Sequence, residues 1–146
     1  MALDFQLQPS PIRTAHLLNS GVRGYSEGKF TPTLGGTATY LAQSGDYTRI
    51  GNSVFVDVIL SVQSIGTGST TVISGLPAEL AVNNTCTFTV GQIALSATAV
   101  VSISGVGFGT QIFLYSKIAA TATDDFHAIF GNGTGIILSG VYRIRR

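Results

Sequence analysis

The chain has 146 residues, of which 45% are hydrophobic and only 10% are charged, and its net charge is +1. This length fits one domain with one core, and the near-neutral charge excludes a long-range field that would attract nucleic acid. A spanning helix needs a run of about 18 apolar residues, which is absent here, so neither a membrane nor a nucleic acid is expected as a partner. The single cysteine, Cys86, excludes a disulfide within one chain and is expected to be a small buried hydrophobe.

Residues 1–27 differ from the rest of the chain because no hydrophobic period is sustained there. Pro9, Pro11 and several glycines interrupt the stretch, and only a short helix at 14–19 is indicated. This region alone cannot bury enough apolar surface to offset its ordering entropy, yet it is too apolar for a solvated tail. We therefore predict an extended N-terminal arm that lies on a neighbouring subunit or on the surface that carries the protein. Its anchoring residues would be Phe5, Leu7, Ile12, Leu17 and Leu18.

From residue 28 onward, the pattern is that of β-strands separated by glycine turns. The clearest strand is 54–63, where five aliphatic residues alternate with a mixed face that includes Asp57. A strand from residue 29 to 34 and a second one ending near Ile50 precede it. Further strands are predicted at 71–73, 85–90, 93–104, 111–118 and 135–145, with hairpin turns at 105–109 and 131–135. The fold predicted for residues 28–146 is therefore all-β, an antiparallel β-sandwich or jelly roll.

Two phrases of the chain carry a resemblance to a known class of proteins. Residues 28–34 read GKFTPTL and residues 45–60 read GDYTRIGNSVFVDVIL, with weaker support from ILSGVYRI at 137–144. These phrases resemble the opening of small β-sandwich modules in the virion proteins of tailed bacteriophages, including capsid decoration proteins and tail-fibre tips. The resemblance covers mainly residues 28–77. It implies a structural or adhesive virion protein that needs no cofactor, rather than an enzyme.

Within that class, two functions are common, and both remain open at this point. Decoration proteins sit as homotrimers on the capsid exterior and cement the major capsid protein, whereas fibre tips bind a receptor that is often a host-surface glycan. We expect decoration, because no stalk repeats precede the sandwich and an apolar arm suits attachment to a lattice through many weak contacts. The alternative is the receptor-binding tip of a head fibre or tail fibre. Exposed aromatic clusters around Tyr40, Tyr47 or Tyr115 would favour it.

The scarcity of charge also predicts an interface between copies. Between Asp57 and Lys117, the only carboxylate or basic side chain is that of Glu79. Strand edges are usually protected by charges, and close packing of identical copies is another way to cover them. Asp57 needs either solvent or a cation such as Arg49 or Lys117, and the C-terminal arginines need solvent or a neighbouring subunit. The residues predicted at the subunit interface are Asp57, Arg49, Lys117, Arg143 and Arg145.

Residues 24–28 read GYSEG and match the G-x-S-x-G sequence motif of the nucleophile elbow in hydrolases. Asp124 or Asp125 and then His127 follow in the order that this fold uses. An elbow needs a preceding strand and a following helix, and the pattern around Ser26 predicts neither. We therefore predict no catalytic triad.

A metal site is not predicted either. His16 and His127 are far apart, and Cys86 has no second cysteine at ligand spacing. The adjacent acids Asp124 and Asp125 lack the further oxygen ligands that a calcium loop requires. The expectation is a protein without catalytic, cofactor-binding or metal-binding residues.

Overall fold

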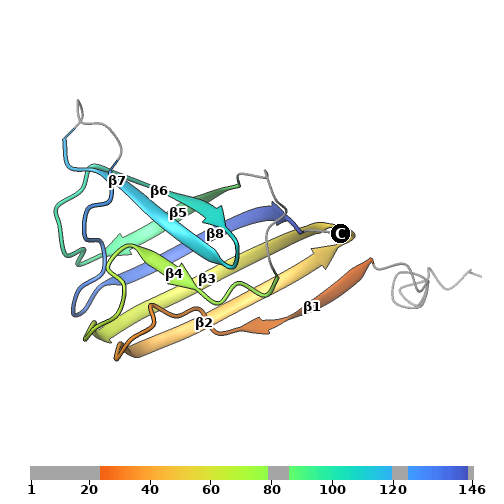
Figure 1. The fold of residues 1–146 in the computed structure, drawn as a ribbon, viewed down its shortest axis with the longest axis horizontal. Helices are drawn as coiled ribbons and strands as arrows, with labels where there is room; N and C mark the ends of the chain where they lie inside the picture. The colour runs from red at the N-terminus through yellow and green to blue at the C-terminus, as the bar shows by residue number, and fades with distance from the viewer. Residues whose placement is uncertain (1–23, 79–85, 120–124, 145–146) are drawn as a thin grey trace, which may run out of the picture.

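The computed structural model describes residues 24–78, 86–119 and 125–144, and Figure 1 shows how their strands are arranged. These residues contain no helix, so none of them forms a helical segment that could cross a membrane. The strands are β1 (Tyr25–Phe30), β2 (Thr39–Ile50), β3 (Ser53–Ser64), β4 (Val72–Ser74), β5 (Thr87–Ala94), β6 (Ser102–Phe108), β7 (Gln111–Lys117) and β8 (Gly135–Arg143). The prediction of an all-β antiparallel fold is confirmed.

All eight strands belong to one continuous sheet in the order β1-β2-β3-β8-β5-β6-β7-β4. The sheet curls, so that β7 and the short β4 cover the inner face of the central strands (Figure 1). The curl brings the two ends of the strand order together: Thr33, after β1, donates to the Ser74 carbonyl at 2.9 Å and accepts from the Ser74 amide at 2.7 Å. The structure therefore differs from the predicted sandwich: a single curled sheet encloses the core, whereas a sandwich encloses it between two separate sheets.

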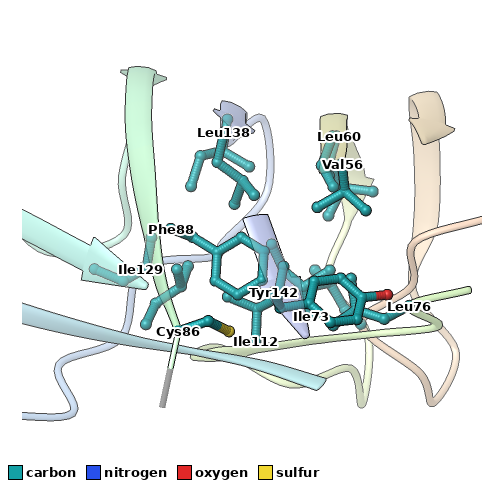
Figure 2. Packing of buried hydrophobic residues seen from close by; sticks show 14 of the residues in the cluster. Val56, Leu60, Ile73, Leu76, Cys86, Phe88, Ile112, Ile129, Leu138 and Tyr142 are labelled. Carbon is teal, nitrogen blue, oxygen red and sulfur yellow. The ribbon is translucent and has the colours of Figure 1, made fainter. Parts of the chain in front are cut away.

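The core lies inside this curl and follows the alternation of β3. Its five valine and leucine side chains that face inward are all at most 2% exposed, as the sequence pattern predicted. Ile73 of β4 and Ile112 and Leu114 of β7 cover them from the other side. Figure 2 shows this packing, with Phe88 and Tyr142 side by side in the cluster and their ring centroids 6.3 Å apart. Each such side chain contributes about 1.5–3 kcal/mol when fully buried.

Two strand glycines make room for Phe88 of β5, which is 1% exposed. Its Cα partners on the neighbouring strands are Gly105 of β6 and Gly140 of β8. A Cβ at Gly140 would lie 2.4 Å from the Phe88 ring, and one at Gly105 would lie 2.8 Å from the Phe88 Cβ. The predicted turn at 105–109 is therefore wrong for most of its length. Gly105 belongs to β6, where its missing side chain leaves room for Phe88, and of the glycines at 105–109 only Gly109 has the positive φ of a turn residue.

The predicted long strand at 93–104 is also wrong. β5 ends at Ala94, and Leu95 adopts a φ of 52°, which breaks the extended backbone. The Ser96 hydroxyl then donates to the Thr98 carbonyl at 2.7 Å. Such short polar side chains offer the backbone local hydrogen bonds that compete with a sheet ladder, and the alternation of small residues did not reveal this.

The N-terminal boundary differs from the expected one as well. β1 begins at Tyr25, opposite Ile50 of β2, so residues 25–27 belong to the sheet and not to the arm. The remaining arm, with the possible helix at 14–19 and all the predicted anchoring residues, lies outside the described residues.

Candidate functional site

The outer surface of β6 and β7 carries a continuous cluster of four aromatic rings. The ring centroids of Phe108 and Phe113 are 6.4 Å apart, and those of Phe113 and Phe126 are 6.3 Å apart, both nearly edge to face. Tyr115 and Phe126 approach more closely, with centroids 4.3 Å apart and planes inclined by 40°. We refer to Phe108, Phe113, Tyr115 and Phe126 together as the aromatic strip.

Three separate segments place these rings. On β7, strict alternation turns Ile112, Leu114 and Ser116 into the core, so that Phe113 and Tyr115 point outward. Phe108 ends β6 on the same outer side. Phe126 follows an isolated bridge in which Ser116 and Asp125 exchange two backbone hydrogen bonds of 2.9 and 3.1 Å. The Asp125 carboxylate also accepts from the Phe126 amide at 2.7 Å, which holds this ring beside β7.

The strip is partly open to solvent, because two of its rings are exposed and Phe113 and Tyr115 are half-buried. Phe108 is 75% exposed and Phe126 is 49% exposed. A contiguous exposed apolar patch on a protein surface marks a place where something else binds. Ring faces accept the flat apolar faces of ligands, and polar groups at the rim fix orientation. Here Gln111 and Lys117 lie at the two ends of the outward row of β7 and form such a polar rim.

Of the three tyrosines singled out in the sequence, only Tyr115 belongs to an exposed aromatic cluster. The Tyr40 hydroxyl accepts a hydrogen bond from the Leu34 amide at 2.7 Å and so fastens the segment after β1. Tyr47 packs over the backbone of Gly28, where an added Cβ would lie 2.9 Å from the tyrosine ring. Phe108, Phe113 and Phe126 were not predicted as site residues from the sequence. The alternation of aromatic residues in 111–117 was a usable signal for Phe113, whereas Phe126 carries no periodic signal at all.

The residues predicted at a subunit interface are spread over the sheet. Asp57 lies on the outer face of β3 opposite Asp46, whose carboxylate already pairs with the Lys29 ammonium at 2.7 Å. Arg49 points to the other face of the sheet, where its Nε donates to the Gly51 carbonyl at 2.8 Å. Asp57 and Arg49 therefore cannot pair within one chain.

The remaining predicted interface residues lie at strand ends. Lys117 is the last residue of β7, which three other strands separate from β3 in the sheet order. Arg143 is exposed at the end of β8, on the same outer face as Asp57. Arg145 lies outside the described residues. The placement of these residues within one chain does not show whether they form an interface between subunits.

The components of the suspected hydrolase motif are placed apart from one another. Ser26 lies inside β1 opposite Arg49, in a small pocket of about 90 Å³, and no helix follows it in the described chain. His127 lies beside β7, where its Nδ1 is 3.3 Å from the Ser116 hydroxyl. Asp124 is outside the described residues. The strand-turn-helix setting that an elbow requires is thus not present around Ser26.

Candidate metal ligands do not converge in the part of the chain that the structure describes, where no group of three His, Cys, Asp or Glu side chains could hold an ion. Cys86 is buried in the core, as predicted, and burial raises the pKa of its thiol. The predicted turn at 131–135 is confirmed: Gly133 has a positive φ, and the Asn132 side chain accepts from the Ile65 amide at 2.9 Å.

The fold and the aromatic strip together define an antiparallel β-sheet module with a partly exposed aromatic surface. No protein-family model matches the chain, and no curated protein matches it in sequence. Among solved structures, the chain is similar to the Dettilon tailspike protein (gp208), with a TM-score of 0.61 and 23% sequence identity. The match covers 82% of this chain and 24% of the tailspike chain, so the chain spans about a quarter of that protein's length. At this identity the likeness establishes a shared fold with part of a tailspike.

Proposed function

We propose that this chain is a binding module of a bacteriophage virion, at the receptor-binding tip of a tail fibre, tail spike or head fibre, and that its aromatic strip holds a host-surface glycan. The observation that carries this proposal is the strip itself, because Tyr115 and three phenylalanines share one exposed surface. The tailspike-like fold and the resemblance of residues 28–77 to phage virion modules support the same class of protein.

The chemistry of the strip fits a sugar better than a charged ligand. Its centre consists of ring faces and edges, against which the C–H face of a pyranose can pack. Its rim includes the side-chain amide of Gln111, whose Nε2 donates to the Ser74 hydroxyl at 3.0 Å and whose Oε1 can accept a hydrogen bond from a sugar hydroxyl. Phe108 and Phe126 are the two most exposed rings, so their removal would disturb the structure of the unliganded protein least. They are therefore the best positions for substitution.

A competition assay tests the proposal. Purified protein is added to host cells before the phage, and the loss of phage adsorption is measured, together with binding to a glycan array. We expect Phe108→Ala and Phe126→Ala each to weaken binding by about tenfold or more, as truncation of an aromatic hot spot does. Leu41→Ala is the matched control, because Leu41 is 70% exposed but lies on β2, away from the strip. Equal binding by the wild type and both phenylalanine variants, or no competition by the wild type, would contradict the proposal.

Capsid decoration by a homotrimer on the capsid exterior stays a prediction from the sequence. Its anchoring residues lie in the arm, outside the described residues. Since β1 begins at Tyr25, the truncation that tests it should remove residues 1–23 and leave the sheet intact. Normal binding of the truncated protein to purified capsids would argue against an anchoring arm.

A further inference from the structure

The outer face of β3 and β8 carries a second apolar surface, on different strands from the aromatic strip. Phe55 lies opposite Val141, and Ile59 lies opposite Ile137. All four side chains are between 44% and 47% exposed, although they occupy neighbouring strands in the interior of the sheet order. We call Phe55, Ile59, Ile137 and Val141 the outer apolar face. The row of Asp57 and Ser139 lies between these two apolar pairs on the same face. Half-exposed apolar side chains gathered on one face of a charge-poor chain are typical of a contact with another molecule.

An acid and a base lie on this same face, on either side of the Phe55–Val141 pair. Asp57 lies opposite Ser139 in the row next to this pair on one side, and Arg143 lies opposite Ser53 in the row next to it on the other. The two charges are therefore four residues apart along the strands, about 13 Å at the rise of an extended chain. This separation is too long for an ion pair within one chain.

The other charges near Asp57 do not neutralise it. Asp46 is its cross-strand neighbour on β2, and that carboxylate is already paired with Lys29 at 2.7 Å. Like charges directly opposite each other are unfavourable, so Asp57 gains from an additional cation. Glu27 of β1 also lies on the outer face of the sheet, and its carboxylate accepts a hydrogen bond from the Tyr25 hydroxyl at 2.7 Å.

We propose that a second copy of this chain packs on the outer apolar face, and that Asp57 of one copy pairs with Arg143 of the next. The face is complementary to itself, because it presents both signs of charge around one apolar row. Asp57 lies between the two apolar pairs and would lose its water in such a contact, so it needs a cation from the partner. Arg143 of the other copy would supply that cation, and the pair would fix the register of the two copies. Every copy offers one acid and one base, so two copies related by a two-fold axis satisfy both charges. The contact does not depend on what the aromatic strip binds.

Charge exchange tests this pairing in the full chain. Sedimentation velocity over a range of concentrations measures self-association of the wild type, Asp57→Arg, Arg143→Asp and the double variant. We expect each single variant to weaken self-association by about tenfold or more, since it places like charges together, and the double variant to recover association to within about threefold of the wild type. Glu27→Arg is the matched control, because it makes the same change of charge as Asp57→Arg on the same face of the sheet, but on β1, away from the outer apolar face. This variant is expected to associate like the wild type.

Circular dichroism of each variant checks that the fold is kept, and the neutral variants Asp57→Asn and Arg143→Gln provide a second test that introduces no repulsion. Both neutral variants are expected to weaken association and to lower its dependence on salt. A wild type that stays monomeric at high concentration would overturn the proposal, as would single variants that associate normally or a double variant that fails to recover. A phage-adsorption result, in either direction, would leave this outcome unchanged, so failure of the glycan proposal is distinguishable from failure of this one.

Discussion

Replacement of Gly140 by alanine probes the way in which the sheet accommodates its largest buried ring. The Phe88 ring lies directly over Gly140, and an added Cβ would lie 2.4 Å from the ring Cδ1 and 3.0 Å from Cε1. Ordinary contacts of such atoms begin at 3.4 Å, so the ring would have to move by about 1 Å. It has little room, because Phe88 is 1% exposed and packs against Tyr142 and Gly105.

The expected cost follows from two opposing effects. Overpacking a close-packed core costs about 1–3 kcal/mol. The reduced freedom of the unfolded chain with alanine in place of glycine offsets about 0.4–1 kcal/mol of this. We therefore expect Gly140→Ala to lower the free energy of unfolding by about 1–2 kcal/mol, and to lower the melting temperature by about 3–8 °C for a domain of this size. Thermal and urea unfolding followed by circular dichroism measure both quantities.

Gly135→Ala is the matched control, because Gly135 belongs to the same strand and an added Cβ there would meet nothing within 4 Å. We expect it to change stability by no more than about 0.5 kcal/mol. In a Phe88→Leu background, Gly140→Ala should cost about 1 kcal/mol less, since the clashing ring is gone. Equal unfolding free energies of Gly140→Ala and Gly135→Ala would show that Phe88 does not clash with a Cβ at residue 140, as would a cost of Gly140→Ala that does not depend on residue 88.

Two further predictions concern buried hydroxyl groups. The Thr134 hydroxyl accepts from the Gly131 amide at 3.0 Å and donates to the Leu95 carbonyl at 2.7 Å, so Thr134→Val should destabilise the protein by about 1–3 kcal/mol in urea unfolding. Thr134→Ser should keep most of the stability, and a valine variant as stable as the wild type would contradict this role. The Tyr142 hydroxyl is buried near the Ala78 backbone without a hydrogen bond of standard geometry in the described chain, and burial raises its pKa to about 12. The unfolded phenol ionises near pH 10, so stability should fall as the pH rises from about 10 to about 12, and Tyr142→Phe should lose this pH dependence while keeping that of the other groups.

The sequence pattern was most informative where one strand alone decides which side chains are buried. The alternation of 54–63 correctly identified the inward face of β3. The same alternation in the predicted strand 135–145 places four large side chains on one side, and all four are buried: Ile136, Leu138, Tyr142 and Ile144. Both predictions rest on the period of two, which is a local property of an extended backbone.

The pattern failed where a distant residue decides the local conformation. Gly105 appeared to belong to a turn, yet it lies in β6 because Phe88 on another strand occupies the space of its missing side chain. The stretch after Ala94 alternates like a strand, but its backbone is tied to distant residues instead: the Ala97 amide donates to the Ile129 carbonyl at 2.9 Å. Local alternation contains no information about these partners.

By itself, the sequence determined that this is an antiparallel β protein with few charges and which side chains of its main strands face inward. Only the tertiary structure decided which outward side chains become neighbours. Phe126 joins Tyr115 through the bridge between Ser116 and Asp125, and Asp57 shares a face with Arg143 through the register of β3 and β8. The physical reason is that alternation follows from the geometry of each strand, whereas strand order and register follow from the packing of the whole curled sheet around its core.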